Sequence, residues 1–292
     1  MLIYILSRNI ELYSTKRLYE AIKNANHKVR VINHMYCDLL IENSQFSILY
    51  EGETLPTPDY IIPRIGSNVT SYGEKVIRHF EKMGVRSLTS SKGLLISRDK
   101  LRCLQVLAEH SINMPTTYFS NDFHEVEEIV KKKLGYPFIL KVTEGTQGLG
   151  VYLIKNEATA QNFFDHFSNS KTQVVLQEFI KESSGRDIRI ITAGQHIIAT
   201  MERIAPKNEF RSNIHRGAMG YEIKLSENEK QIAVKALKAV GLKFGGVDII
   251  RSKNGPLILE INSSPGLEGI EKTTQIDIAG EVVKFIEQDY KL

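Results

Sequence analysis

Three oxygen-bearing side chains stand close together near the C-terminus of the sequence. Residues 245–262 read GGVDIIRSKNGPLILEIN, two apolar runs joined by the tripeptide KNG at 253–255. This pattern predicts a β-hairpin whose three-residue loop ends in a left-handed glycine. Counting outward from that loop places Asp248 opposite Glu260. Asn262 shares their face, because strand residues two apart point to the same side.

Two carboxylates and an amide oxygen on one face favour a divalent cation. The carboxylates repel each other, and burial adds to the cost of their charge. Carboxylate and amide oxygens suit Mg²⁺ or Mn²⁺, above all an ion that also holds phosphate oxygens. The alternative is a strand with one solvated face, on which Asp, Glu and Asn are ordinary. The residues alone leave both interpretations open.

A glycine-rich turn lies between two strand-like runs earlier in the chain. In ILKVTEGTQGLGVYLI (139–154) the turn spans 145–150, and its glycines would let backbone N–H groups approach phosphate oxygens. It is not a Walker loop, because no Gly-Lys-Ser/Thr follows. It is not a Rossmann fingerprint, because the chain continues into a strand. A lid over a nucleotide fits better, and a simple hairpin turn is the alternative.

A lysine and two further clusters support a nucleotide site. Lys141 stands in the apolar strand before the glycine-rich turn and needs an anion, either a nucleotide phosphate or a protein carboxylate. The run LQEFIKE (176–182) offers apolar contacts and Glu178 to a purine. A loop at 209–220 collects Arg211, Asn213, His215 and Arg216. Arginine suits bidentate binding of phosphate or carboxylate, although an exposed basic loop is the alternative.

The first third of the chain shows an alternation of strand-like and helical patterns, which would help to position these residues. Strand-like runs alternate with helical patterns at 2–7, 15–26, 28–33, 60–66 and 73–84. Such repetition predicts a parallel α/β sheet. Arg64 stands at a predicted strand end, where open α/β sheets bind ligands, and a surface charge is the equal alternative.

The rest of the chain mixes helices with strands. Leucines at helical spacing predict a helix within 97–117 that Ser97 could cap. Further helices are predicted at 122–135, 227–241 and 277–290. Strands are predicted at 172–182, twice within 186–205, and in the hairpin. The chain is therefore expected to be of the mixed α/β class.

Length and composition limit the classes of protein to which this chain could belong. A chain of 292 residues with 42% hydrophobic residues fits two or three subdomains. The net charge of +4 allows an anionic substrate but does not argue for nucleic-acid binding. Cys37 and Cys103 have no metal or disulfide spacing, which indicates a reducing, cytoplasmic setting.

No segment predicts a membrane protein. The start, MLIYILSRN, lacks a basic leader and reads as a first strand, not as a signal peptide. No apolar run approaches the ~20 residues of a membrane span.

The order of these motifs resembles the ATP-grasp superfamily, and within it the RimK-type glutamate ligases. The residues that carry the likeness follow one another along nearly the whole chain: RDK (98–100), Lys141, EGTQGLGV (144–151), QEF (177–179), RDIR (186–189), RSNIHRG (211–217), GVDII (246–250) and LEINSSPGLEGIE (259–271). RimK-type ligases add glutamate to the C-terminus of a small-subunit ribosomal protein.

The resemblance implies an ATP-grasp fold in three parts. Residues 1–95 would form a Rossmann-like pre-ATP-grasp domain. Residues 96–175 would form a central subdomain that carries the glycine-rich lid. Residues 176–292 would form a C-terminal subdomain with an antiparallel sheet and the metal site.

The resemblance also implies roles for residues around ATP. Lys100 and Lys141 would contact the phosphates. Glu178 and Phe179 would lie at the adenine, and Asp187 at the ribose.

The basic loop and the hairpin would complete the site. Arg211, Ser212 and Asn213 would bind the nucleotide, with Arg211 and Asn213 as the catalytic residues at the reacting carboxylate. Two Mg²⁺ or Mn²⁺ ions would be held by Asp248, Glu260 and Asn262, with Glu260 bridging them. One departure from the family pattern is the AMG that follows RSNIHRG, where a second glycine is usual.

The implied reaction has two steps and needs no protein nucleophile. A carboxylate of the acceptor attacks the γ-phosphate of ATP, and the amino group of L-glutamate then attacks the resulting acyl phosphate. Arg203, Arg211 or Arg216 could hold the carboxylates of the free amino acid. Nucleic acid and membrane are not expected as partners, and an assembly of identical chains is compatible with the sequence.

Three other functions compete with this interpretation. The first is the same chemistry with another amino acid, or with a small-molecule or coenzyme acceptor. The second is a non-catalytic nucleotide-binding regulator, which predicts the loss of a metal ligand. The third is a kinase or a nicotinamide oxidoreductase, which the absence of Walker and Rossmann contexts disfavours.

Overall fold

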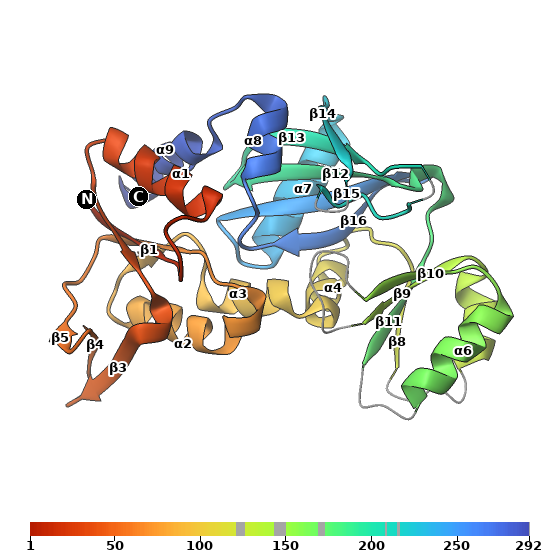
Figure 1. The fold of residues 1–292 in the computed structure, drawn as a ribbon, viewed down its shortest axis with the longest axis horizontal. Helices are drawn as coiled ribbons and strands as arrows, with labels where there is room; N and C mark the ends of the chain where they lie inside the picture. The colour runs from red at the N-terminus through yellow and green to blue at the C-terminus, as the bar shows by residue number, and fades with distance from the viewer. Residues whose placement is uncertain (121–125, 143–149, 169–172, 208, 215–216, 292) are drawn as a thin grey trace.

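Four β-sheets organise the described part of the chain (Figure 1). The computed structural model describes residues 1–120, 126–142, 150–168, 173–207, 209–214 and 217–291. The first sheet is parallel, in the order β2-β1-β6-β7. Its strands are β1 (Leu2–Leu6), β2 (Lys28–Ile32), β6 (Tyr60–Pro63) and β7 (Arg86–Ser87). The helices that follow them are α1 (Tyr13–Asn24), α2 (Thr70–Lys82) and α3 (Ser91–Arg98). The alternating pattern therefore predicted this sheet correctly.

A small antiparallel sheet lies beside the first sheet and was not predicted. It contains β3 (Cys37–Glu42), β4 (Gln45–Tyr50) and β5 (Glu53–Thr54). Most side chains of β3 and β5 are exposed or half-buried, so no clear apolar alternation marks them. Asn43 and Ser44 form a two-residue turn, and both have positive φ, as a type I′ hairpin requires.

The second sheet is antiparallel, in the order β10-β9-β11-β8. Its strands are β8 (Thr117–Ser120), β9 (Phe138–Val142), β10 (Val151–Ile154) and β11 (Val174–Glu178). Helix α6 (Glu157–Ser168) packs on it through Phe164. Within the predicted helix at 122–135, α5 spans Val126–Ile129 and a π turn spans Val130–Leu134, while 121–125 lie outside the described residues.

The third sheet is also antiparallel, in the order β14-β13-β12-β15-β16. Its strands are β12 (Arg186–Ala193), β13 (His196–Ile204), β14 (Met219–Glu222), β15 (Phe244–Ser252) and β16 (Gly255–Asn262). Ile188, Ile190 and Val247 point to one face, where α7 (Glu227–Ala239) and α4 (Lys100–Glu109) cover them. Polar residues alternate with these isoleucines and valines along the strands, so the polar side chains lie on the opposite face of the sheet.

The start of α4 corrects one prediction. Asp99 is the N-cap, and its carboxylate accepts a hydrogen bond from the backbone N–H of Arg102 at 2.9 Å. Ser97 belongs to the separate helix α3 and donates to the carbonyl of Leu94. The predicted Ser97 cap is therefore wrong, because α3 and α4 meet at Asp99 and the leucine spacing concealed the break.

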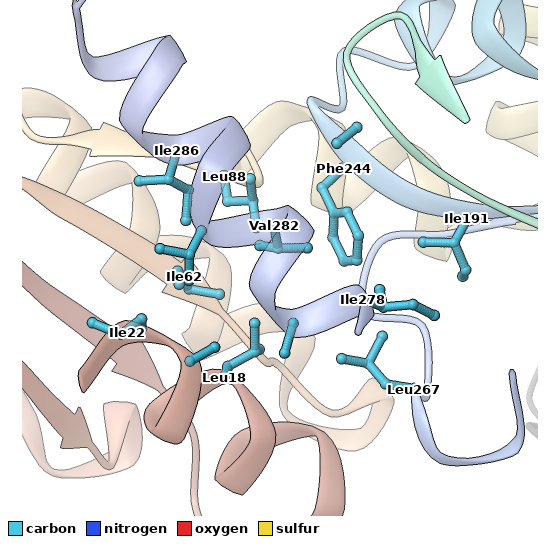
Figure 2. Close-up of a cluster of buried hydrophobic side chains, with 14 of the residues drawn as sticks. Leu18, Ile22, Ile62, Leu88, Ile191, Phe244, Leu267, Ile278, Val282 and Ile286 are labelled. Carbon is cyan, nitrogen blue, oxygen red and sulfur yellow. The ribbon is translucent and has the colours of Figure 1, made fainter. Parts of the chain in front are cut away.

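The C-terminal helix joins the first and third sheets. Helix α9 (Ile278–Lys291) lies beside α1 (Figure 1), and α8 (Glu268–Thr274) precedes it. Figure 2 shows Ile278, Val282 and Ile286 of α9 between residues of the first sheet's unit and residues of the third sheet. All three are buried, and each contributes about 1.5–3 kcal/mol by leaving water. The two sheets therefore share one core.

The sheets suggest how to divide the chain. We propose the three units 1–95, 96–175 and 176–292 given above. Strand β11 crosses the second boundary, and all of it pairs with β9 of the central unit. No helix in the described part of the chain is both long and apolar enough to cross a membrane.

Candidate active site

The hairpin of β15 and β16 brings two predicted ligands together. Asp248 pairs directly with Glu260, as predicted. The loop is different, because Ser252 pairs with Gly255 and only Lys253 and Asn254 remain between the strands. The predicted three-residue loop is therefore wrong. The register shifts between Asp248 and Ile249, so that Leu259 is an extra residue on β16.

This β-bulge restores the opposition of the carboxylates. Without it, the two-residue loop would pair Asp248 with Leu259. A bulge changes the direction of the side chains that follow it. It leaves Ile258 and Ile261 in the apolar core and turns Glu260 to the polar face.

The oxygen atoms on this face fit a divalent cation. Asn262 donates from Nδ2 to Glu260 Oε1 at 3.1 Å, which leaves its amide oxygen available. Burial raises the pKa of Glu260, although 52% of its side chain is exposed, and the negative charge of Asp248 raises it further. A cation between the two carboxylates would relieve that repulsion. The described residues contain no group of three or more His, Cys, Asp and Glu side chains placed to hold a metal, so this donor set consists of two carboxylates and an amide.

Asp248 is also held by two arginines. Arg189 donates to it from Nε at 2.8 Å and from Nη2 at 2.7 Å. Arg203 Nη2 donates to Asp248 Oδ2 at 2.8 Å, and its fork also binds Asp187, with both distances 2.6 Å. Burial would raise the pKa of Asp248, but the two guanidinium groups outweigh burial and hold that pKa well below its usual range. Asp248 is therefore a carboxylate in the free protein.

Sequence reasoning missed this chain of ion pairs. Arg189 lies directly opposite Asp248 in the register of β12 and β15, and Arg203 lies opposite Asp187 in β12 and β13. The only signal in the sequence is the alternation of charge with isoleucine in RDIR. Arg203 was a candidate for binding the amino acid, but it is 2% exposed and two carboxylates occupy its fork.

The two predicted phosphate lysines lie beside the hairpin. Lys141, in β9, donates to Gln177 Oε1 at 2.7 Å and makes no ion pair with a carboxylate in the part of the chain that the structure describes. Burial lowers the pKa of Lys141 to about 8; the charge of Glu260 opposes this shift, and that of Lys100 adds to it. Burial likewise lowers the pKa of Lys100, again against the charge of Glu260. Two lysines, one from helix α4 and one from strand β9, thus lie within electrostatic reach of Glu260.

The predicted adenine residues lie where the second sheet leads into the third. Glu178, at the end of β11, accepts from the backbone N–H of Thr116 at 3.2 Å, and its own N–H donates to the carbonyl of Thr116 at 2.8 Å. Phe179 follows and is half-buried. Asp187 lies on the polar face of β12, held by Arg203.

The basic loop reaches the second sheet. Arg211 binds Glu209 through Nε and Nη2 at 2.9 and 2.8 Å, and Nη1 donates to the carbonyl of Val151 in β10 at 3.3 Å. Hydrogen bonds from Arg211 lower the pKa of Glu209 to about 2. Ser212 is buried and hydrogen-bonds Asp187, and Asn213 is half-buried.

Part of the predicted site lies outside the described residues. His215, Arg216 and most of the glycine-rich turn, 143–149, belong to that part. The strands that flank the turn are neighbours, with Lys141 opposite Val151, so the turn connects two paired antiparallel strands as predicted.

Comparison with known proteins decides the family. Residues 1–94 match the RimK PreATP-grasp domain, and residues 97–286 match the RimK-like ATP-grasp domain. The chain belongs to the RimK-like ATP-grasp family.

Relatives of this ATP-grasp protein match it from end to end. A probable alpha-L-glutamate ligase of Nitrosococcus oceani is 46% identical, with 99% of this chain and 96% of the relative covered. Another, of Cellvibrio japonicus, is 47% identical, with 100% and 97% covered. The solved structure of the ATP-grasp ligase PsnB with precursor peptide PsnA2 and AMPPNP has a TM-score of 0.78 at 17% identity, with 100% of this chain and 98% of that chain covered.

These matches confirm the ATP-grasp fold and the class of enzyme. This RimK-like chain is an ATP-grasp ligase, an ADP-forming enzyme. The roles of single residues remain predictions, and the geometry above is what supports them.

Proposed function

We propose that this chain is an ATP-dependent α-L-glutamate ligase that adds glutamate to the C-terminal carboxylate of a small-subunit ribosomal protein. The observation that carries the proposal is the hairpin face on which Asp248 opposes Glu260, with Lys100 and Lys141 beside it. Transfer of a phosphoryl group needs this combination of cations for phosphate and oxygens for metal. The names of the two curated relatives support glutamate as the added amino acid.

The reaction proceeds through an acyl phosphate. An oxygen of the acceptor carboxylate bonds to the γ-phosphorus of ATP while the bond to the β-phosphate oxygen breaks, and ADP leaves. The amino nitrogen of glutamate then bonds to the carbonyl carbon of the acyl phosphate. The carbon–oxygen bond to phosphate breaks, inorganic phosphate leaves, and the nitrogen loses a proton.

The chain contributes charge and position to both steps. Lys100 and Lys141 neutralise the charge of phosphate oxygens. Because Lys141 is buried away from water, its attraction to a phosphate is stronger than it would be in solvent. Arg211 and Asn213 lie on the loop that leads back to β10, where they can orient the reacting carboxylate. Glu178 and Phe179 bind the adenine, and Asp187 and Ser212 line the ribose side. Holding the reactants in line supplies most of the rate in such reactions.

Asp248, Glu260 and Asn262 would hold two Mg²⁺ or Mn²⁺ ions. When bound, these ions supply positive charge to the β- and γ-phosphates. One solved structure of PsnB is a complex with minimal precursor, Mg and ADP, which supports magnesium for this chain. Arg189 helps to keep Asp248 ionised and fixed in orientation. Oδ1 accepts one hydrogen bond and Oδ2 accepts two, so Oδ1 would be the oxygen offered to the cation.

The glycine-rich turn between β9 and β10 serves as the lid. An acyl phosphate hydrolyses readily, so water must be excluded while it exists.

The cytoplasm is the proposed compartment, in agreement with two cysteines that are buried and unpaired.

The test is ADP release by the purified protein with ATP and Mg²⁺, with each amino acid in turn, and with small-subunit ribosomal proteins as acceptors. Release that depends on glutamate, together with mass increments of a glutamyl residue on one ribosomal protein, establishes the proposal. Release with another amino acid, or only with a small-molecule acceptor, keeps the ligase and replaces the substrate. The matched control is Glu260→Gln, which should release no ADP under any of these conditions.

A further inference from the structure

Two arginines lie side by side at the carboxyl edge of the first sheet. Arg64 directly follows β6, and Arg98 is the last residue of α3. Arg64 Nη2 donates to the carbonyl of Pro265 at 2.9 Å, and Arg98 Nη2 donates to the carbonyl of Ile65 at 2.6 Å. Both acceptors are neutral. Burial and, to a smaller extent, the charge of Arg98 lower the pKa of Arg64 to about 10. Arg98 donates to Ile65, the residue that directly follows Arg64, so the two arginines are close.

The pair lacks a counter-charge in the described structure. Neither arginine forms an ion pair with a carboxylate among the residues described. The Nε of Arg98 is buried and has no hydrogen-bond partner there. A charged donor that is buried without an acceptor is costly, so something should offset it.

Other arginines of this chain show how it usually meets that cost. Arg189 and Arg203 are both paired with Asp248, at 2.7 and 2.8 Å. In each case the protein supplies the acid from a neighbouring element. At Arg64 and Arg98 the missing partner is therefore expected to come from a ligand.

The position of the pair points to a substrate of the ligase. Burial lowers the pKa of Arg98, and the charge of Glu260 opposes that shift, so Arg98 lies within electrostatic reach of the hairpin. Pro265, which Arg64 contacts, follows β16 by only three residues. The carboxyl edge of a parallel sheet is where open α/β folds bind ligands. The two predicted phosphate lysines come from α4 and β9, whereas Arg64 follows β6 and Arg98 ends α3.

We propose that Arg64 and Arg98 form a binding site for a carboxylate of a non-nucleotide substrate. This inference rests on the proposed function, because a ligase of this kind takes two such substrates, the free amino acid and the acceptor. A guanidinium fork matches a carboxylate with two parallel hydrogen bonds, and the Nε of Arg98, which has no partner among the described residues, belongs to one edge of such a fork. The site would fix the substrate relative to Glu260.

A purely structural role is the competing explanation. Arg98 lies in the last turn of α3, where a positive charge is favourable, and both arginines clamp backbone carbonyls. Replacement of either arginine by glutamine separates the two explanations. Glutamine keeps an N–H donor for the backbone carbonyl but lacks the positive charge and the guanidinium fork. Lysine keeps the charge and removes the fork.

The experiment measures the KM values for ATP, for L-glutamate and for the acceptor in Arg64→Gln, Arg98→Gln and Arg64→Lys. We expect a rise of about 10- to 100-fold in the KM for glutamate or for the acceptor, as for loss of a charged hydrogen-bonded pair. The KM for ATP should stay within about twofold. A rise for glutamate assigns the carboxylate to the amino acid, and a rise for the acceptor assigns it to the acceptor. The matched control is Arg102→Gln, a 56% exposed arginine on α4 that should change none of the three.

Two results would overturn the inference: unchanged KM values for both carboxylate substrates in folded variants, or a rise for ATP alone. Folding is checked from the thermal unfolding midpoint, and Arg64→Lys serves if Arg64→Gln does not fold. If the wild-type chain releases no ADP with any amino acid, the proposed function has failed and the site is tested directly. Calorimetric titration of L-glutamate and of glutarate should then show binding to the wild type that Arg64→Gln and Arg98→Gln lose, and no binding to the wild type would refute the site.

Discussion

The two carboxylates of the hairpin differ in their surroundings, and this difference decides which one tests the metal site cleanly. Asp248 is buried between Arg189 and Arg203, so its replacement leaves buried guanidinium groups without a partner. That loss alone costs about 3–5 kcal/mol of stability. Glu260 is half exposed, and its polar partners are Asn262 and the more distant Arg189 at 3.8 Å. A change at Glu260 therefore affects the chemistry more than the fold.

We expect Glu260→Gln to lower kcat by at least about 100-fold, because it removes one charge from the metal ligands. The unfolding midpoint in urea should stay at the wild-type value. The matched control is Glu268→Gln on α8, whose side chain is also 52% exposed and which should keep full activity. Full activity in Glu260→Gln, with Mg²⁺ saturating, would contradict the role of Glu260 as a ligand.

The titration of Lys141 should make ATP binding depend on pH. Its pKa in the free enzyme is about 8, and phosphate oxygens beside it should raise that pKa. Binding of ATP at pH 8.5 should therefore take up more than about half a proton, measured by calorimetry in buffers with different ionisation enthalpies. Lys141→Arg is the control, since arginine stays protonated and the uptake should disappear. An equal uptake in the variant would mean that another group titrates.

The same lysine affects stability in a defined pH range. Between pH 8 and the ordinary lysine pKa of about 10.4, the folded chain binds fewer protons at Lys141 than the unfolded chain. The free energy of unfolding contributed by this group therefore rises with pH across that range and is lowest below pH 8.

At the scale of elements, the polar face of the third sheet is stabilised by charge that crosses three strands. Arg203 on β13 binds Asp187 on β12 and Asp248 on β15, and all three are buried. We expect Arg203→Gln to lower the free energy of unfolding by about 3–5 kcal/mol in urea denaturation, because two buried carboxylates lose their partner. The control is Arg186→Gln. Arg186 is an exposed arginine on β12, 3.6 Å from Glu202, and its replacement should lower the free energy of unfolding by less than about 1 kcal/mol. A loss of that small size at Arg203 would show that water reaches the carboxylates.

The elements also show how far the sequence could predict the site. Apolar alternation and the KNG tripeptide predicted the hairpin and the opposition of Asp248 and Glu260, yet the loop has two residues and a bulge at Leu259 compensates. A bulge depends on packing of Ile258 and Ile261 against α7, which local spacing does not reveal. The partners of Asp248 were hidden for a similar reason. Arg189 is 59 residues away, and its proximity depends on β12 pairing with β15 and not only with its neighbour in sequence.

At the scale of the whole molecule, one core sets the distance between the two halves of the active site. Arg64 follows β6 of the first sheet and Arg98 ends α3, whereas the hairpin belongs to the third sheet. The cluster around α9 joins them, and Leu267, just past the hairpin, lies within it and donates its N–H to Ser14 Oγ at 3.0 Å (Figure 2). If the arginines bind substrate as proposed, we expect stability and substrate position to be coupled through residues that contact no substrate.

Ile286→Ala tests this coupling. Ile286 is fully buried on α9, and the cavity left by the substitution should lower the free energy of unfolding by about 2–5 kcal/mol. Because the core belongs to both sheets, hydrogen exchange should accelerate together in β1, β6 and β15, while β9 and β11, which have a separate core, change less. Lys284→Ala, an exposed substitution on the same helix, is the control and should change neither measurement. Acceleration confined to α9 and β1 would show that the third sheet is held in place by other contacts.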